Sequence, residues 1–176
     1  MERRKKIIAL FKEMDFQLNI SLFDDRLIAQ KIVCLLELKG LKLGYPYSIY
    51  VRGPYSPDLT KDLYEFTEEF QEFKSETRLN TIESETAGDL NRIFGLRPVL
   101  LEVGATYGYY MKRENCDPLE AQKRVKQLKP FYSQAQVAVG ISKAKEFLFE
   151  PTVKDLEELR NETGPWQRAA LRSNRH

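Results

Sequence analysis

Residues 45–59 read YPYSIYVRGPYSPDL, and the hydrophobic period changes twice within this stretch. Apolar and polar residues alternate over 45–52, as they do in a half-buried strand. Gly53-Pro54 then breaks the alternation. Ser56-Pro57 is typical of a helix start, because serine caps the first turn and proline suits the first helical position. We therefore predict a strand over 45–52, followed by a turn and a helix.

Helical periodicity lies on both sides of this stretch. Upstream, apolar residues at three- and four-residue spacings predict helices over 2–14 and 24–39. Asp24 is placed to cap the second of these helices, and Gly40 is placed to end it in a left-handed conformation. Downstream, apolar residues over 59–73 form one stripe at spacings of four and three, which predicts a single helix.

The rest of the chain is mostly helical as well. Residues 74–88 are polar and aperiodic, which predicts a long loop or a weak β-hairpin wing. A short helix is expected near 89–94. Helical stripes then begin at Pro98, at the capping sequence 117–120 and at the capping box 133–136, and a last short helix is expected from Pro151.

These elements predict a mainly α fold with a minor β-hairpin or strand element. We expect a winged-helix-like N-terminal half followed by a C-terminal helical bundle, together forming one compact domain over 1–160. Residues 161–176 are rich in arginine and read as a basic, frayed tail.

Composition narrows the class of protein. The chain has 176 residues, 42% of them hydrophobic and 31% charged, an ordinary globular mixture. No apolar run is long enough to span a bilayer, and the basic N-terminus is not followed by a signal-peptide pattern, so we expect no membrane association. Cys34 and Cys116 are isolated thiols, as is usual in a reducing compartment. We therefore expect a cytoplasmic protein.

The residues needed for common catalysis are missing. The only histidine is His176, the last residue, so a histidine base or zinc ligand is excluded in practice. None of the usual glycine-rich phosphate, dinucleotide or hydrolase loops occurs. We expect no enzymatic activity, no cofactor and no metal site.

One enzymatic interpretation survives as a distant third. Pro57-Asp58 followed by Glu72-Phe73-Lys74 matches the pattern of Mg²⁺-dependent nucleases, in which the two carboxylates converge on a cation. Here both carboxylates lie on one predicted helix, 14 residues and so about 21 Å apart. A straight helix would keep them from sharing a metal.

A nucleic-acid-binding regulator with a winged-helix-like fold is the main alternative function. Lysine and arginine clusters could neutralise phosphates. The helix expected to enter a DNA groove carries six acidic residues and only one basic residue, Lys61, so another surface would have to bind. The candidate contacts are Arg3, Arg4, Lys5, Lys6, Lys123, Arg124 and Lys126.

Several short stretches resemble one known family. They are Gln30-Lys31-Ile32-Val33, the run 50–59, Leu101-Glu102 with Ala105-Thr106, and Lys129-Pro130-Phe131 ahead of Ala144. Over roughly 24–148 the chain is similar to the Panacea (SocA-like antitoxin) domains and to related YwgA-like small prokaryotic proteins. Their most specific shared feature is the Gly-Pro-Tyr-Ser core.

The resemblance implies a helical, winged-helix-like fold and a role in binding and neutralising another protein, often a toxin. It supplies no catalytic residues. The chain departs from the family at Cys34, where an aromatic residue is usual, and over 74–88, where a glycine-marked turn is expected but is not evident. The second departure puts the wing in question.

The leading interpretation is a non-enzymatic protein-interaction module, antitoxin-like or adaptor-like. A rigid turn at Gly53-Pro54 would present Tyr50, Arg52 and Tyr55 together, and tyrosine and arginine are enriched at binding hot spots. The same turn could simply orient the next helix, with its tyrosines covering the edge of the core. Composition leaves the identity of the partner and the oligomeric state open.

Overall fold

The computed structural model describes residues 3–149, 157 and 160–161, and 67% of them are helical. The prediction of a mainly α fold with a minor β element is confirmed. In this part of the chain the elements are α1 (Arg3–Glu13), α2 (Phe23–Lys39), β1 (Ser48–Tyr50), β2 (Gly53–Tyr55), α3 (Pro57–Glu65), α4 (Thr67–Gln71), α5 (Thr81–Phe94), α6 (Pro98–Lys112), α7 (Pro118–Leu128) and α8 (Gln134–Leu148).

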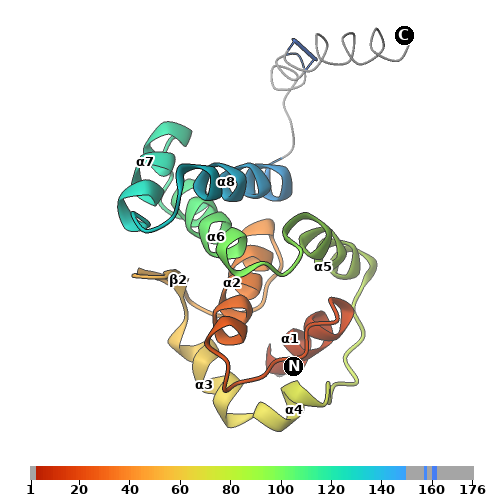
Figure 1. The fold of residues 1–176 in the computed structure, drawn as a ribbon. Helices are drawn as coiled ribbons and strands as arrows, with labels where there is room; N and C mark the ends of the chain where they lie inside the picture. Colours follow the sequence, from red (N-terminus) through yellow and green to blue (C-terminus); the bar gives the residue numbers. More distant parts are fainter. Residues whose placement is uncertain (1–2, 150–156, 158–159, 162–176) are drawn as a thin grey trace, which may run out of the picture.

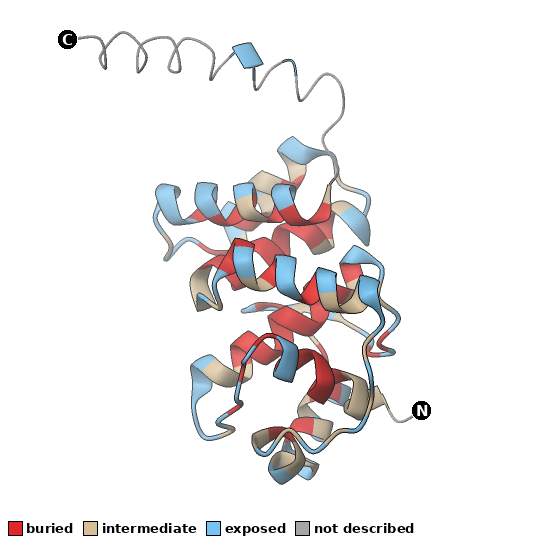
Figure 2. Ribbon diagram, turned by 90° about the vertical axis from the view of Figure 1, so that its right-hand side faces the viewer, coloured by how far each residue is buried: buried red, intermediate tan, exposed pale blue. Residues whose placement is uncertain are grey.

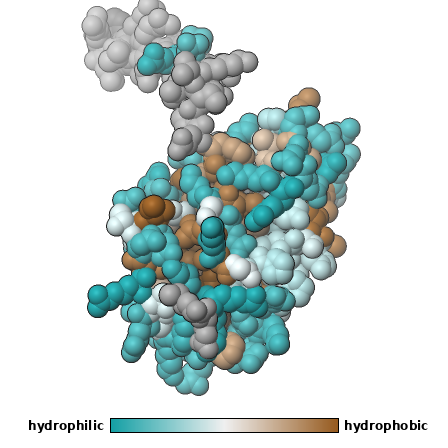
Figure 3. Space-filling model, turned by 180° about the vertical axis from the view of Figure 1, so that it is seen from behind, coloured by the Kyte–Doolittle hydropathy of each residue, from teal (hydrophilic) through white to brown (hydrophobic). Residues whose placement is uncertain are grey.

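Helix α2 runs through the centre of the molecule, with α1 and α5 on one side and the hairpin on the other (Figure 1). Every residue from Leu27 to Leu36 is buried, as is typical of a helix surrounded by other elements. Buried residues lie on the faces of the helices that point into the molecule, and exposed residues lie on the outer faces (Figure 2). Seen from behind, charged and polar residues cover most of the surface, with apolar residues between them (Figure 3).

Helix α6 joins two parts of the hydrophobic core. One cluster of buried side chains extends from α1 to α6 and takes in Phe147 and Leu148 at the end of α8. The other is built from α6, α7 and α8, with Val103, Tyr107 and Val125 among its members. The expected C-terminal bundle therefore packs onto the N-terminal half through α6, and the two halves form one compact domain.

The two N-terminal helices lie where the sequence predicts, but the predicted cap of α2 is wrong. The residue before α2 is Leu22, whose side chain makes no capping hydrogen bond. Asp24 lies inside the first turn, and the neighbouring Asp25 carboxylate accepts a hydrogen bond from the Asn19 backbone N–H at 2.8 Å. Gly40 ends the helix as expected, with φ +120°.

The predicted strand over 45–52 is too long, and Gly53-Pro54 is not the turn. Only Ser48–Tyr50 pairs, because its antiparallel partner Gly53–Tyr55 has just three residues. The turn lies at Val51-Arg52, so the minor β element is a hairpin placed before α3. Ser56 caps α3 as predicted, with its hydroxyl accepting from the Leu59 N–H at 3.4 Å.

The single helix predicted over 59–73 is two helices that break at Phe66. The Thr67 hydroxyl lies 2.8 Å from the Leu63 carbonyl oxygen and 3.0 Å from that of Tyr64. It therefore satisfies carbonyls that a continuous helix would pair with backbone N–H groups. A polar side chain thus ends α3, although the apolar stripe continues.

The loop or β-hairpin wing expected over 74–88 is not a hairpin; the β-hairpin of the described residues is β1–β2, before α3. After a stretch without helix or strand over 74–80, α5 begins at Thr81 within the expected loop, so the helix predicted near 89–94 is longer. Its start is fixed by a capping box between Asn80 and Glu83. Glu83 also pairs with Lys6 on α1 at 2.5 Å, which ties the start of α5 to the N-terminal helix.

Three expectations fall on residues that are mostly not described. The last short helix from Pro151, the domain limit at 160 and the tail over 161–176 lie largely or wholly outside the described residues. Within the described part, no helix combines the length and hydrophobicity that crossing a membrane requires.

Candidate functional site

Two adjacent side chains of α2 hydrogen-bond to the backbone at the end of the hairpin. The Gln30 amide accepts from the Ser56 N–H at 3.0 Å and donates to the Ser56 carbonyl at 3.0 Å and to the Thr60 hydroxyl at 2.9 Å. The Lys31 ammonium donates to the Pro54 carbonyl at 2.6 Å. Both side chains are buried. The backbone over 54–56 is therefore fixed by a central helix.

Helix α6 supports the hairpin from a second side. Gly53 has φ +88°, and a Cβ atom there would lie under 3.0 Å from the Thr106 hydroxyl oxygen. Only glycine combines this backbone conformation with such close approach to α6. One turn earlier on α6, the fully buried Glu102 carboxylate accepts from the Lys129 ammonium at 2.8 Å.

The Glu102–Lys129 pair connects the hairpin tip to the segment between α7 and α8. Lys129 also donates to the Val51 carbonyl at 3.1 Å, and the Tyr132 hydroxyl donates to the second oxygen of Glu102. Burial lowers the pKa of Lys129, and burial with the Glu102 hydrogen bond raises the pKa of Tyr132 to about 12. The pair is thus a neutralised, hydrogen-bonded unit at the base of the hairpin.

Arg52 lies at the hairpin tip with half of its side chain exposed. Its guanidinium is 3.4 Å from the Tyr132 hydroxyl and 3.7 Å from Glu102 Oε2. It also lies 5.4 Å from the ring centroids of both Phe23 and Phe131, within cation–π range. The charge of Arg52 is therefore held in place between two exposed aromatic rings.

The five residues predicted to bind a partner divide into two groups. Gly53 and Pro54 are buried and Tyr55 is half-buried, with its hydroxyl 2.7 Å from that of Thr60. Tyr50 and Arg52 are exposed. The first group fixes the hairpin and the second is presented at its tip.

Exposed apolar side chains gather around this tip. Five of the nine large apolar side chains that are exposed in the described part of the chain lie at this tip or, in the case of Tyr64, across the hollow beside it, and they are between 49% and 73% exposed. With Arg52 they form a surface that we call the hairpin face. Its members are Phe23, Tyr50, Val51, Arg52, Tyr64 and Phe131.

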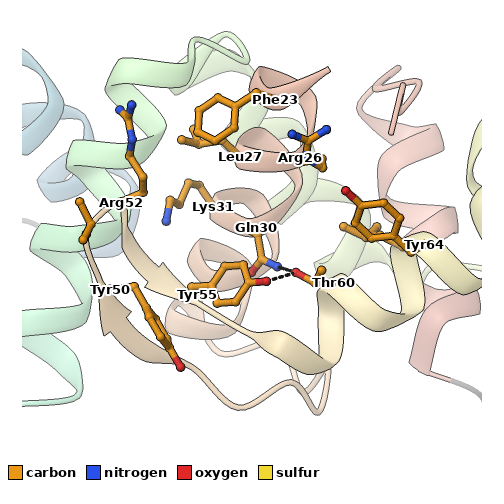
Figure 4. A pocket seen from close by; sticks show the side chains of 12 residues that line it. Phe23, Arg26, Leu27, Gln30, Lys31, Tyr50, Arg52, Tyr55, Thr60 and Tyr64 are labelled. Atoms are coloured by element: carbon orange, nitrogen blue, oxygen red, sulfur yellow. Dashed lines mark hydrogen bonds between the residues drawn. The ribbon is translucent and has the colours of Figure 1, made fainter. Parts of the chain in front are cut away.

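A hollow of about 420 Å³ opens on the hairpin face between α2, the hairpin and α3 (Figure 4). The aromatic rings of Phe23, Tyr55 and Tyr64 surround it, and Lys31 lies at its inner wall. Burial lowers the pKa of Lys31 to about 8. No aspartate or glutamate lines the hollow.

The basic residues proposed to contact nucleic acid do not form one surface. α1 and α7 lie at opposite ends of the molecule (Figure 1). On α1 the cations are paired with carboxylates of α3, α4 and α5: Arg3 with Asp58 and Asp62, Arg4 and Lys5 with Glu69, and Lys6 with Glu83.

On α7, Arg124 is paired with Glu114 and Glu120, whereas Lys123 and Lys126 are exposed and no carboxylate of the described residues pairs with them. The acidic α3 and α4 therefore face their own N-terminal helix, and most of the predicted phosphate contacts are already neutralised within the chain.

The two nuclease-like carboxylates point to different partners. Asp58 pairs with Arg3 at 3.4 Å, and Glu72 pairs with Lys74 at 2.7 Å. Among the described residues no group of three or more histidine, cysteine or acidic side chains has the arrangement to hold a metal ion. The break at Phe66 does not bring the two carboxylates into one site.

Sequence reasoning missed Phe23, Glu102, Lys129 and Phe131 as parts of this site. All except Phe23 lie in stretches quoted for the family resemblance, but no local pattern indicates that they meet at the hairpin.

Comparison of the chain with models of protein families, with curated proteins and with solved structures finds no match.

Proposed function

We propose that this chain is a non-enzymatic protein-interaction module, antitoxin-like or adaptor-like, that binds another protein through the hairpin face. The observation that carries the proposal is the gathering of exposed aromatic rings around Arg52 at the tip of a rigidly supported hairpin. Contiguous exposed apolar surface marks interaction sites, and tyrosine and arginine supply much of the energy at binding hot spots.

The support beneath the hairpin favours binding over a purely structural role. Gln30, Lys31 and Lys129 fix the hairpin backbone without covering Tyr50 or Val51. A surface that is already ordered loses little conformational entropy when a partner binds. The segments quoted for the antitoxin resemblance also meet at this place in the fold, through Gln30-Lys31, Gly53–Tyr55, Thr106 and Lys129.

The alternative, a nucleic-acid-binding regulator, has less support. Binding through α1 would require Arg3, Lys5 and Lys6 to exchange their carboxylate partners for phosphates. Of the seven candidate contacts, only Lys123 and Lys126 are both exposed and outside the ion pairs of the described residues. Two cations neutralise fewer phosphates than the six to ten contacts typical of salt-sensitive DNA binders.

Affinity capture from a native lysate of the source organism tests the proposal. The bait is the wild-type chain, Val51→Asp in the hairpin face, or Leu119→Asp, a matched control on α7 that is 79% exposed. A specific protein captured at high salt by wild type and by Leu119→Asp, and lost with Val51→Asp, supports the module.

The other outcomes weigh against the proposal. Equal capture of every protein by the two aspartate variants would refute the hairpin face as the binding surface. Captured nucleic acid that is released at high salt and depends on Lys123 and Lys126 would favour the regulator instead.

A further inference from the structure

The hollow beside the hairpin has the size and lining of a small-molecule site. Its volume of about 420 Å³ falls within the range of roughly 300–1,000 Å³ that is usual for ligand pockets. Most of its wall is aromatic or aliphatic, with Leu27 and Leu63 on the inner side. The polar Gln30 and Thr60 in the wall bond to each other at 2.9 Å. Because these polar atoms already bond to each other, they do not need water or a polar ligand in the hollow, and an apolar ligand can fill it.

The charge of the lining has one sign. Arg26, Lys31 and Arg52 line the hollow, and no carboxylate does. Arg26 donates to the Ile20 carbonyl at 2.7 Å, and no carboxylate of the described residues lies within 4.0 Å of either Arg26 or Lys31. Beside Arg52, the acidic group is Glu102, whose carboxylate lies 3.7 Å from the Arg52 guanidinium and is already paired with Lys129.

Lys31 is a buried cation in the wall of the hollow. It is 2% exposed, and one of the three N–H groups of its ammonium has a protein acceptor, the Pro54 carbonyl. A buried cation without a counter-ion is costly, and an anion supplied from outside would offset that cost. In Figure 4 its nitrogen lies on the same side of the hollow as Arg52, whereas Arg26 and Tyr64 lie on the far side.

We propose that the hollow binds a small amphiphilic carboxylate, with the carboxylate against Lys31 and Arg52 and an apolar chain or ring between Leu27, Tyr55 and Leu63. The apolar wall accepts the tail, and the two cations at one end fix its direction. A neutral ligand leaves Lys31 without a counter-ion, and a cationic one is repelled. This site shares lining residues with the hairpin face, but the proposal does not rest on the protein-binding role.

Decanoate, decanol and decyltrimethylammonium test the proposal, because they share a ten-carbon chain and differ in charge. Each is titrated into the wild-type chain below its micelle concentration by calorimetry, at pH 7. We expect decanoate to bind at least tenfold more tightly than the trimethylammonium compound, with decanol between them. In a nitrogen-edited NMR spectrum, the amide signals of α2, the hairpin and α3 should shift.

Two variants and one control locate the carboxylate. Lys31→Met keeps an unbranched apolar side chain, one heavy atom shorter than lysine, and removes the charge, so decanoate should bind at least tenfold more weakly. Arg52→Gln, at a half-exposed position, gives a second test if Lys31→Met does not fold. Lys123→Met on α7 should change nothing. Absence of decanoate binding, equal binding of the carboxylate and the ammonium compound, or binding unaffected in every folded variant would overturn the proposal.

Discussion

Replacement of Gly53 by alanine tests whether the hairpin is locked against α6. Two costs are expected. A left-handed backbone at φ +88° costs a residue with a Cβ atom roughly 1–2 kcal/mol. A methyl group under 3.0 Å from the Thr106 hydroxyl oxygen adds an overpacking cost of roughly 1–3 kcal/mol. Gly53→Ala should therefore destabilise the fold by roughly 2–5 kcal/mol in total.

The two costs can be separated by a second substitution and a control. Thr106→Ala removes the oxygen that the new methyl group would meet, so adding Gly53→Ala to Thr106→Ala should cost only the backbone part, roughly 1–2 kcal/mol relative to Thr106→Ala alone. Gly40→Ala is the matched control, because Gly40 has φ +120° and its Cβ would meet nothing within 4 Å. It should show the backbone cost without the clash.

Urea unfolding followed by helical circular dichroism gives the free energies of unfolding of the wild-type chain, the three single variants and the double variant. For a domain of this size each 1 kcal/mol also lowers Tm by roughly 2–4 °C. The reasoning is refuted if Gly53→Ala costs no more than Gly40→Ala. It is also refuted if Gly53→Ala costs as much in the Thr106→Ala background as in the wild-type chain, since the hairpin would then not be packed on α6 as described.

Three further predictions concern buried groups. Burial lowers the pKa of Lys31 from 10.5 to about 8, so folding releases a proton between these values. The free energy of unfolding should therefore rise with pH across that window, by up to about 3 kcal/mol relative to a Lys31→Met reference at the same pH. If the free energies of unfolding of the wild-type chain and of Lys31→Met change with pH in parallel, the prediction is contradicted. Lys129→Met leaves the buried Glu102 carboxylate without its cation and should lower the free energy of unfolding in urea by roughly 3–5 kcal/mol. A loss under about 1 kcal/mol, as for a surface substitution, would mean that the pair is not buried as described. Burial raises the pKa of Cys34 to about 12, so a thiol reagent should label Cys116 in the native protein and reach Cys34 only on unfolding; rapid labelling of both would contradict this.

The elements that the sequence predicts correctly are those with local causes. The Ser56-Pro57 start of α3 and the capping box before α8 depend on residues three or four apart, and their bonds form as expected. The start of α5 had the same kind of local signal, because Asn80 is followed three residues later by Glu83. The polar composition of 74–88 outweighed that signal and favoured a loop.

The errors at the hairpin have causes that are distant in the sequence. Gly53-Pro54 has the composition of a turn, but the left-handed glycine serves the approach to Thr106 on α6. Likewise, nothing near Lys129 in the sequence indicates that it meets Val51 and Glu102. Local periodicity therefore predicted most helices, whereas the candidate site depends on contacts among α2, α6 and the segment before α8.

The most direct test of the proposed function is the affinity of a purified partner for two alanine variants, one at Tyr50 and one at Ile82. Tyr50, on the hairpin face, is 49% exposed, and Ile82, on α5, is 72% exposed. If the hairpin face binds the partner, Tyr50→Ala should raise Kd more than tenfold, which corresponds to about 2 kcal/mol for a hot spot, with little change in Tm. Ile82→Ala should leave Kd within about twofold, since surface substitutions away from an interface have small effects. Equal Kd values for the wild-type chain and Tyr50→Ala would contradict the proposed function.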